Sequence, residues 1–323
     1  MPESQMAEVQ LTEADFKKAP TIIVIDVTNS CNLRCPVCPV TISMHRKRGL
    51  MKMNVFSKII DDFKDRPEKP AIYFNFSGEP TMNKALPEMV AYSSTNGHDT
   101  FLSTNATKLT EKMAEDLINA GLARVNLCMD GFSDIAQESY RVGSKFNAVK
   151  ENIEMFLKVR KRMGVKNPEC VLQTLLTSYS ENQMDEMTAW AKKSGFDKVR
   201  YKTFSIGSYT TEEEKAANSK FLPKNEDLLR HPTGRTLETC PLPTYQTVVF
   251  WNGDLGLCCL DYDQMVQLPN VEEKGFMQAY TSPEVIAARM KGYYKEFDIC
   301  KGCSLGNAES MGFKINFDTQ ASA

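Results

Sequence analysis

Strand and helix patterns alternate six times between residues 21 and 206. The predicted strands are short, apolar or β-branched segments: Thr21–Val27, Ala71–Phe76, Thr100–Ser103, Arg124–Met129, Cys170–Leu176 and Lys198–Phe204. Helical patterns separate these strands: Asn54–Phe63, Glu111–Ala120, Phe146–Met163 and Asn182–Ser194, the last three each followed by a glycine. Six βα units in series predict a parallel sheet with outer helices, and six units instead of eight predict a partial (β/α)6 TIM-type barrel.

The pattern changes after Phe204, so we expect four segments. They are an N-terminal extension (1–20), the partial barrel (21–206), a polar linker or long loop (207–239) and a small C-terminal unit (240–323). The last unit contains a hairpin signal, Thr247–Trp251 and Leu255–Leu260 around Asn252-Gly253, because Asn-Gly suits the positive φ of a tight turn. A helix is predicted from Ser282 onward. The fold class is therefore α/β, a partial barrel with a small hairpin and helix extension.

The charge balance excludes several classes of function. The chain carries 39 Lys+Arg and 41 Asp+Glu, a net charge of −2, so it has no overall field that would attract nucleic acid or an anionic membrane. No apolar run approaches the ~18 residues of a membrane helix. The polar N-terminus lacks the apolar core of a signal peptide. We therefore expect a cytoplasmic protein with no nucleic-acid or membrane partner.

Eight of the ten cysteines fall into two groups. In a reducing compartment, grouped cysteines more often bind metal than form disulfides. Only three histidines accompany them, none at helical ligand spacing, so sulfur is the expected ligand, and sulfur-rich sites favour zinc or iron–sulfur clusters. Cys31, Cys35 and Cys38 follow the first predicted strand, at the barrel edge where catalytic sites lie. Three thiolates leave one iron of a four-iron cube open, whereas zinc would need a fourth ligand, for which His45 is the nearby candidate.

The segment CNLRCPVC at residues 31–38 resembles the signature of the radical S-adenosylmethionine (SAM) superfamily. Later strand ends carry similar motifs in the expected order. Ser77-Gly78-Glu79-Pro80 resembles the Gly-Gly-Glu-Pro turn that binds the SAM amino group, with Ser77 in place of the first glycine. Ser103 and Asn105 lie in a segment similar to Thr-Asn-Gly, Asp130 in one similar to Ser-x-Asp-Gly near the SAM ribose, and Arg141 in the stretch before the fourth helix. One departure is Val37, where the family usually has an aromatic residue near adenine.

The resemblance implies a first cofactor site with two components. A [4Fe–4S] cluster would be held by Cys31, Cys35 and Cys38. SAM would be bound by residues at three strand ends and in the stretch before the fourth helix: Ser77, Gly78, Glu79, Pro80, Ser103, Asn105, Asp130 and Arg141. One electron would then cleave SAM to methionine and a 5′-deoxyadenosyl radical, which abstracts a hydrogen atom from the substrate. A flavodoxin or ferredoxin would be a suitable electron donor.

The second cysteine group resembles the SPASM/twitch extension of radical SAM enzymes, in its shorter twitch form with one auxiliary [4Fe–4S] cluster. It contains five cysteines: Cys240, Cys258, Cys259, Cys300 and Cys303. Neighbouring strand residues point to opposite faces, so Cys258 and Cys259 cannot easily reach one cluster. The preceding Trp251–Asp254 turn resembles the family's turn before a ligand and favours Cys258. The predicted ligands are therefore Cys240, Cys258, Cys300 and Cys303, with four-thiolate zinc as the alternative.

Two reactions of twitch-containing relatives fit this pattern by resemblance. The favoured one oxidises an alcohol carbon of a sugar or aminocyclitol, with the auxiliary cluster taking the second electron. The other inverts a sugar carbon and needs a cysteine as hydrogen donor. Cys128 and Cys259 are the candidates, although a free cysteine is more often a packing residue.

Two further classes are weaker. A ribosomal-peptide maturase often has an N-terminal recognition domain, and about twenty residues before the first strand are too few for one, which favours a small-molecule substrate. A cluster scaffold or sensor would not need the SAM motifs. The basic run at residues 45–48 is expected to be a solvated face, or else to bind a phosphate or the acidic surface of an electron donor.

Overall fold

The computed structural model describes residues 11–204, 206, 210–229, 238–301, 303 and 313–317. The predicted partial barrel is confirmed. Six parallel strands lie side by side in chain order: β1 (Ile22–Ile25), β2 (Ala71–Phe74), β3 (Thr100–Thr104), β4 (Arg124–Cys128), β5 (Glu169–Leu176) and β6 (Lys198–Thr203). Because all six run the same way, their C-terminal ends meet at one edge of the sheet.

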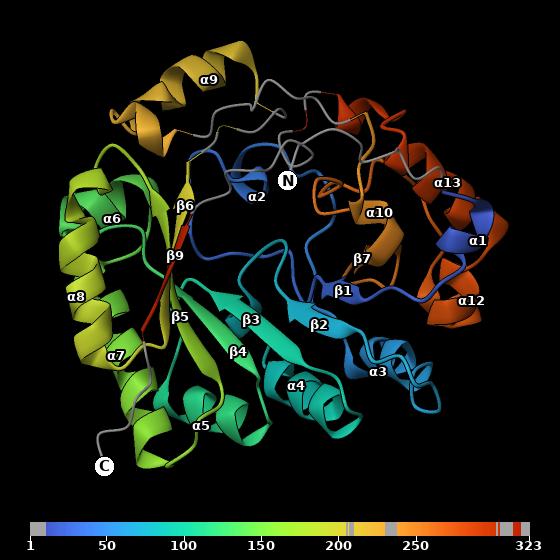
Figure 1. Ribbon diagram of the computed structural model, residues 1–323, viewed down its shortest axis with the longest axis horizontal. Helices are drawn as coiled ribbons and strands as arrows, with labels where there is room; N and C mark the ends of the chain where they lie inside the picture. Colours follow the sequence, from blue (N-terminus) through green and yellow to red (C-terminus); the bar gives the residue numbers. More distant parts are fainter. Residues whose placement is uncertain are drawn as a thin grey trace, which may run out of the picture.

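Helices cover the outer side of this curved sheet (Figure 1). They are α3 (Met53–Asp61), α4 (Leu86–Thr95), α5 (Glu111–Asn119), α6 (Asp134–Tyr140), α7 (Phe146–Arg162) and α8 (Met184–Ser194). The predicted helices are confirmed to within about two residues at each end. A short helix, α2 (Pro39–Ile42), follows the first cysteine loop, and 3-10 turns η1 (Pro80–Met82) and η2 (Glu181–Gln183) follow β2 and β5. No helix in the described ranges is long and apolar enough to cross a membrane.

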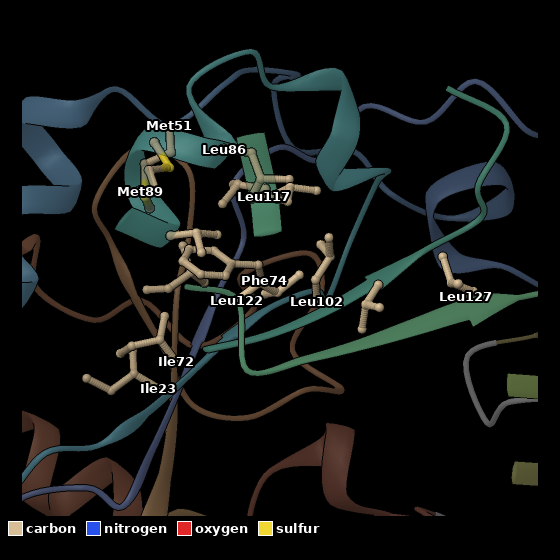
Figure 2. Packing of buried hydrophobic residues seen from close by; sticks show 14 of the residues in the cluster. Ile23, Met51, Ile72, Phe74, Leu86, Met89, Leu102, Leu117, Leu122 and Leu127 are labelled. Atoms are coloured by element: carbon tan, nitrogen blue, oxygen red, sulfur yellow. The ribbon is translucent and has the colours of Figure 1, made fainter. Parts of the chain in front are cut away.

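The apolar core lies between the sheet and these helices. Figure 2 shows Ile72, Phe74 and Leu102 of the strands packed with Leu86 and Leu117 of the helices, all of them buried. Since side chains alternate along a strand, the residues between these core positions point to the opposite, inner face of the barrel. This inner face is polar where β3, β4 and β5 end, because Ser103, Asn126 and Gln173 occupy it.

The C-terminal unit extends the same sheet. Strand β7 (Gln246–Val249) pairs parallel with β1, β8 (Leu255–Gly256) pairs antiparallel with β7, and β9 (Phe313–Asn316) pairs antiparallel with β6. The predicted hairpin is thus present with shorter strands. Its helices are α10 (Leu242–Tyr245), α11 (Val271–Lys274), α12 (Phe276–Tyr280) and α13 (Pro283–Tyr293), with the 3-10 turn η5 (Asp298–Cys300). The predicted cap is confirmed, because the Ser282 hydroxyl accepts a hydrogen bond from the Val285 N–H.

Two expected segments lie partly outside the described residues. Of the predicted linker 207–239, residues 210–229 hold α9 (Glu212–Asn218) and the 3-10 turns η3 (Ser219–Phe221) and η4 (Glu226–Leu228), while residues 207–209 and 230–237 are not described. Of the N-terminal extension, residues 1–10 are not described. Helix α1 (Glu13–Phe16) lies beside α13 (Figure 1), where the Arg289 guanidinium donates to the Phe16 carbonyl at 2.5 Å.

Candidate active site

The first cysteine group lies on the loop between β1 and α2, at the C-terminal edge of the sheet. Cys31, Cys35 and Cys38 are each half-buried. Arg48 holds this loop in place, since its guanidinium donates to the Val40 carbonyl at 2.7 Å and also to the Asn29 carbonyl. Arg48 thus links the residue before the cysteine loop to the helix that follows it.

The three thiols share one electrostatic environment. Burial raises the pKa of each of them, that of Cys35 to about 12. The value for Cys35 includes smaller increases from the charges of Cys38 and Cys31, and the Arg141 guanidinium lowers the pKa of all three thiols. Three soft sulfur donors beside a fixed cation are a suitable donor set for an anionic iron–sulfur cluster.

The spacing of these donors matters for the choice between one ion and a cluster. Within the described part of the chain, no three His, Cys, Asp or Glu side chains are grouped closely enough to hold a metal ion. In a [4Fe–4S] cluster each cysteine binds a different iron, so its thiols need not converge on one point. Three half-buried thiols on one loop, with the Arg141 cation acting on each of them, are the donors that such a cluster requires, so the residues present fit it.

The turn after β2 packs directly on the cysteine loop. Gly78 has a φ of 69°, and a Cβ at this position would lie 2.4 Å from the Thr28 carbonyl oxygen and 2.5 Å from that of Ser30. The Glu79 N–H donates to the same Ser30 carbonyl at 2.8 Å. Only glycine fits, both for the backbone conformation and for the space.

Glu79 is buried, and hydrogen bonds to its carboxylate connect the ends of β2 and β3. Its Oε1 accepts from the Thr81 hydroxyl at 2.7 Å and the Thr104 hydroxyl at 2.6 Å, and its Oε2 accepts from the Asn105 N–H at 2.8 Å. The same carboxylate accepts from the Thr81 N–H at 3.2 Å and so caps η1, which begins at Pro80. Glu79 therefore supports the turn from within. Thr104 was not predicted, although it lies between the predicted Ser103 and Asn105.

Asn105 reaches the cysteine loop, and Ser103 does not. The Asn105 side-chain amide lies 3.9 Å from Cys31 Sγ and donates to Asn32 Oδ1 at 3.3 Å. Ser103 faces the barrel interior, where its hydroxyl accepts from the Asn126 side chain at 2.9 Å. Asn105 therefore lies at the cysteine loop, whereas Ser103 lies inside the barrel.

Asp130 and Arg141 form a buried ion pair between β4 and α6. Asp130 Oδ2 lies 2.5 Å from Arg141 Nε, and its Oδ1 accepts from the Leu175 N–H at 2.9 Å. Burial lowers the pKa of Arg141, but Asp130 and Cys35 together raise it well above its ordinary value, so the cation is maintained. Its charge faces both the cysteine loop and the end of β4.

Aromatic rings surround Val37, where the family usually has an aromatic residue. Val37 packs in a buried cluster with Tyr140, Phe204 and Phe221. The ring of Tyr140 stands edge-on to that of Phe204, 5.4 Å between centroids. Aromatic residues from α6, from the end of β6 and from η3 therefore pack around the position where the family usually has an aromatic residue.

The second cysteine group also comes together. Four thiols, those of Cys240, Cys258, Cys300 and Cys303, line one small apolar hollow that is partly open to solvent. They are the four ligands predicted from the sequence. Cys259 does not line the hollow. Burial, followed by the charges of Cys303 and Cys240, raises the pKa of Cys259 to about 11.

The two candidate hydrogen donors have different surroundings. Cys128 is buried at the end of β4, and its Sγ accepts from the Gln173 side chain at 3.5 Å on the inner face of the barrel. Burial raises its pKa, and the charges of Arg141 and Asp130 also act on it. Cys259 lies beside the auxiliary thiols. The charge of Lys202 of β6 lowers the pKa of both thiols.

The basic run at residues 45–48 is only partly a solvated face. The side chain of His45 is 86% exposed, as expected, but that of Arg46 is 8% exposed and donates to Asp26 Oδ2 at 3.0 Å. Burial raises the pKa of Asp26 to about 6, against the opposing charge of Arg46. His45, Lys47 and Arg48 are exposed, as a solvated face requires, and only Arg46 is turned inward.

These features define a class of protein. A partial βα barrel whose strand ends gather three thiols, a glycine turn and an Asp–Arg pair, followed by a four-thiol hollow, is an iron–sulfur enzyme of the barrel type. The family model of the radical SAM superfamily matches residues 25–191, and that of SPASM, an iron-sulfur cluster-binding domain, matches residues 240–304. The chain belongs to the radical SAM superfamily, and its cofactors are SAM and [4Fe–4S] clusters.

Curated relatives match the chain over part of its length. One is the tungsten-containing aldehyde ferredoxin oxidoreductase cofactor-modifying protein of Pyrococcus furiosus, 30% identical over 178 residues, which are 54% of this chain and 49% of the relative. Another is the PqqA peptide cyclase of Bradyrhizobium diazoefficiens, 28% identical over 151 residues, 46% and 38% of the two chains. The chain thus spans half or less of the length of these relatives.

Solved structures share the fold over nearly the whole chain. The crystal structure of BtrN in complex with AdoMet and 2-DOIA superposes with a TM-score of 0.55 at 18% identity, covering 88% of this chain and 93% of BtrN. Streptococcus suis SuiB bound to S-adenosylmethionine gives a TM-score of 0.64 at 16% identity, with coverage of 90% and 72%. At these identities the likeness concerns the fold alone.

Proposed function

We propose that this protein is a radical SAM oxidoreductase that oxidises an alcohol carbon of a small polar substrate, a sugar or an aminocyclitol. The observation that carries the proposal is the four-thiol hollow, because an auxiliary cluster there gives the substrate radical an acceptor for its second electron. The likeness to BtrN, which was solved with AdoMet and 2-DOIA and is covered over 93% of its length, supports it. We further propose the division into residues 1–20, 21–206, 207–239 and 240–323.

In the first site, residues at different strand ends would bind different parts of the cluster and SAM. Cys31, Cys35 and Cys38 would hold the SAM-binding cluster, while Arg141 offsets their negative charge. The backbone of residues 77–80 would receive the SAM amino group, with Glu79 fixing that turn from behind. When bound, cluster and SAM together supply a 5′-deoxyadenosyl radical that takes a hydrogen atom from the substrate.

Other residues would shape the rest of the pocket. Asn105 would lie beside SAM next to Cys31, and Asp130 near its ribose, held by Arg141. Ser103 and Asn126, which are hydrogen-bonded to each other on the inner barrel wall, would meet a hydroxylated substrate. A flavodoxin or ferredoxin would supply the first electron.

The auxiliary site would be held by Cys240, Cys258, Cys300 and Cys303. An auxiliary cluster held there would supply an acceptor for one electron, so that the substrate, having given a hydrogen atom to the adenosyl radical, would lose that electron and one proton to solvent. The alcohol becomes a carbonyl, and methionine and 5′-deoxyadenosine leave. Atoms and electrons balance without a further oxidant for the first turnover.

A second candidate, inversion of a sugar carbon, is favoured by one observation. Cys128 lies on the inner barrel face with its Sγ held by Gln173, where a thiol can return a hydrogen atom. Cys259 is the less suitable donor, because it lies beside Cys240 and Cys303. A ribosomal peptide is a third candidate substrate, supported by the likeness to the PqqA peptide cyclase and to SuiB.

Mass spectrometry separates these functions. The protein is incubated anaerobically with SAM, a reductant and candidate sugars, aminocyclitols or peptides, in H2O and in D2O. Oxidation gives a product about 2 Da lighter, because two hydrogens are lost. Inversion leaves the mass unchanged in H2O and adds about 1 Da in D2O, because a thiol exchanges its hydrogen with solvent.

The cysteine variants complete this experiment. If oxidation is correct, Cys128→Ala and Cys259→Ala leave the mass change intact. Deuterium that enters a mass-neutral product and disappears in Cys128→Ala would overturn oxidation in favour of inversion. A modified peptide with no conversion of any sugar would assign the protein to peptide maturation.

A further inference from the structure

The loop that follows the first cysteine group lies directly against the segment that follows the hairpin cysteines. The N–H groups of His45 and Arg46 donate to Asp263 Oδ1 at 2.7 and 2.9 Å, and His45 Nδ1 lies 2.9 Å from Asp263 Oδ2. The Ser43 hydroxyl donates to the Tyr262 hydroxyl at 3.1 Å. These contacts, here called the 43–46/262–263 contact, join two segments more than 200 residues apart.

Arg46 links the 43–46/262–263 contact to residues at the strand ends of the barrel. Its Nε donates to the Tyr262 carbonyl at 2.7 Å, while one terminal nitrogen donates to Asp26 Oδ2 at 3.0 Å and to the Ser77 hydroxyl at 3.3 Å. Asp26, just after β1, is fully buried, and Ser77 begins the turn proposed to bind the SAM amino group. One guanidinium therefore holds the auxiliary segment, the end of β1 and the SAM turn at fixed relative positions.

Phe250 adds an apolar contact to the same place. It follows β7 and is fully buried, with its ring 4.2 Å from the Arg46 guanidinium and 5.9 Å from the ring of Phe76. Phe76 has a φ of 111°, which is unusual for an aromatic residue. Strained conformations of this kind persist where the surrounding structure holds them. The C-terminal unit thus supports both residues that precede Gly78. Phe76 lies near Phe250, and Ser77 is bonded by Arg46, which Tyr262 holds.

The remaining side of the loop is also covered by the C-terminal unit. The Trp251 indole N–H donates to the Lys47 carbonyl at 3.1 Å, and a Cβ at Gly49 would lie 2.5 Å from the Trp251 ring. The ring therefore lies flat on the loop at a distance that only glycine permits. Ordering of the hairpin and the turn after it consequently orders the loop that carries Arg46.

We propose that Arg46 is a positioning residue that couples the auxiliary cysteine site to the SAM turn, so that loading the auxiliary site tightens SAM binding. The inference rests on the proposed function of both sites. A filled auxiliary site fixes Cys258 and the turn that follows it, which fixes Tyr262 and Asp263, and through them Arg46 and Ser77. Coupling between two binding sites is reciprocal, so SAM also favours the loaded auxiliary site.

A double-mutant cycle tests the coupling through SAM affinity, with no need for turnover. SAM dissociation constants are measured by anaerobic equilibrium dialysis on reconstituted protein, with iron content determined for every sample. The four corners are the unmodified chain, Cys300→Ala, Arg46→Met and the double variant. Arg162→Met is the matched control, because Arg162 is about half exposed and pairs only with Glu111 and Glu115 on the surface.

When Arg46 is present, we expect Cys300→Ala to weaken SAM binding about fivefold or more. A roughly fivefold change is the lower end of the coupling that is typical between two binding sites. In the Arg46→Met background the same change should weaken it less than about twofold, whereas the Arg162→Met background should behave like the unmodified chain. Equal losses with and without Arg46, or no loss in Cys300→Ala, would overturn the coupling.

A second variant covers the case in which Arg46→Met does not take up iron. Asp263→Ala removes the acceptor for the His45 and Arg46 N–H groups but leaves the Arg46 side chain in place, and it should reduce the coupling in the same cycle. Full coupling in Asp263→Ala would count against the 43–46/262–263 contact. Failure of the unmodified, iron-loaded chain to bind SAM would instead contradict the proposed function, so the two failures are distinguishable.

Discussion

The tightest steric constraint in the turn proposed to bind SAM is at Gly78, and Gly78→Ala tests it. The new Cβ would lie 2.4 Å from the Thr28 carbonyl oxygen, whereas ordinary contact begins at 3.4 Å, so the turn must move by about 1 Å. This displacement removes the Glu79 N–H to Ser30 hydrogen bond, a loss of about 1 kcal/mol. The positive φ adds about 1 kcal/mol of strain.

Gly195→Ala is the matched control. Gly195 has a φ of 92°, but nothing lies within 4 Å of its Cβ position, so alanine there meets the strain without the clash. Thermal unfolding under anaerobic conditions should show Gly78→Ala about 2 kcal/mol less stable than Gly195→Ala, from overpacking and the lost hydrogen bond. A displacement of about 1 Å in a binding turn should also weaken SAM binding at least tenfold in Gly78→Ala alone. Equal stabilities and SAM affinities within twofold of each other would refute this reasoning.

Three further predictions concern the clusters and one buried carboxyl. Anaerobic reconstitution should give about 8 irons per chain, and a Cys31, Cys35 and Cys38 triple alanine variant about half of that; stoichiometric zinc at the auxiliary thiols would contradict it. Cys35→Ala should abolish 5′-deoxyadenosine formation, measured by chromatography, because a cluster with two ligands cannot keep its open iron in place; undiminished product would reject the site. Because burial raises the folded-state pKa of Asp26 to about 6, its stabilising contribution is present at low pH and is lost as the pH rises towards and through 6. In urea unfolding, Asp26→Asn should therefore gain about 1.4 kcal/mol relative to the unmodified protein between pH 5 and pH 7.5, and a constant difference would exclude this carboxyl as the cause.

The barrel and the first site could be predicted because their signals are local. Apolar residues recur with strand or helix spacing inside each element, and glycines mark helix ends, so neither signal depends on distant residues. Since all parallel strands end at one edge, motifs at successive strand ends had to meet there, as Cys31, Glu79 and Asn105 do. The same logic could not identify Thr104 as a partner of Glu79, because a threonine at a strand end has many possible partners.

The sequence alone determined the six βα units, the two cysteine groups and the glycine of the turn after β2. Only the tertiary structure decided that β7 adds to the β1 edge and that Arg46 is buried against Asp26. The physical reason is that these features are contacts between segments far apart in the chain. A basic run has the same pattern whether water or a buried carboxylate surrounds it, and only the packing of the C-terminal unit on the cysteine loop removes water from Arg46.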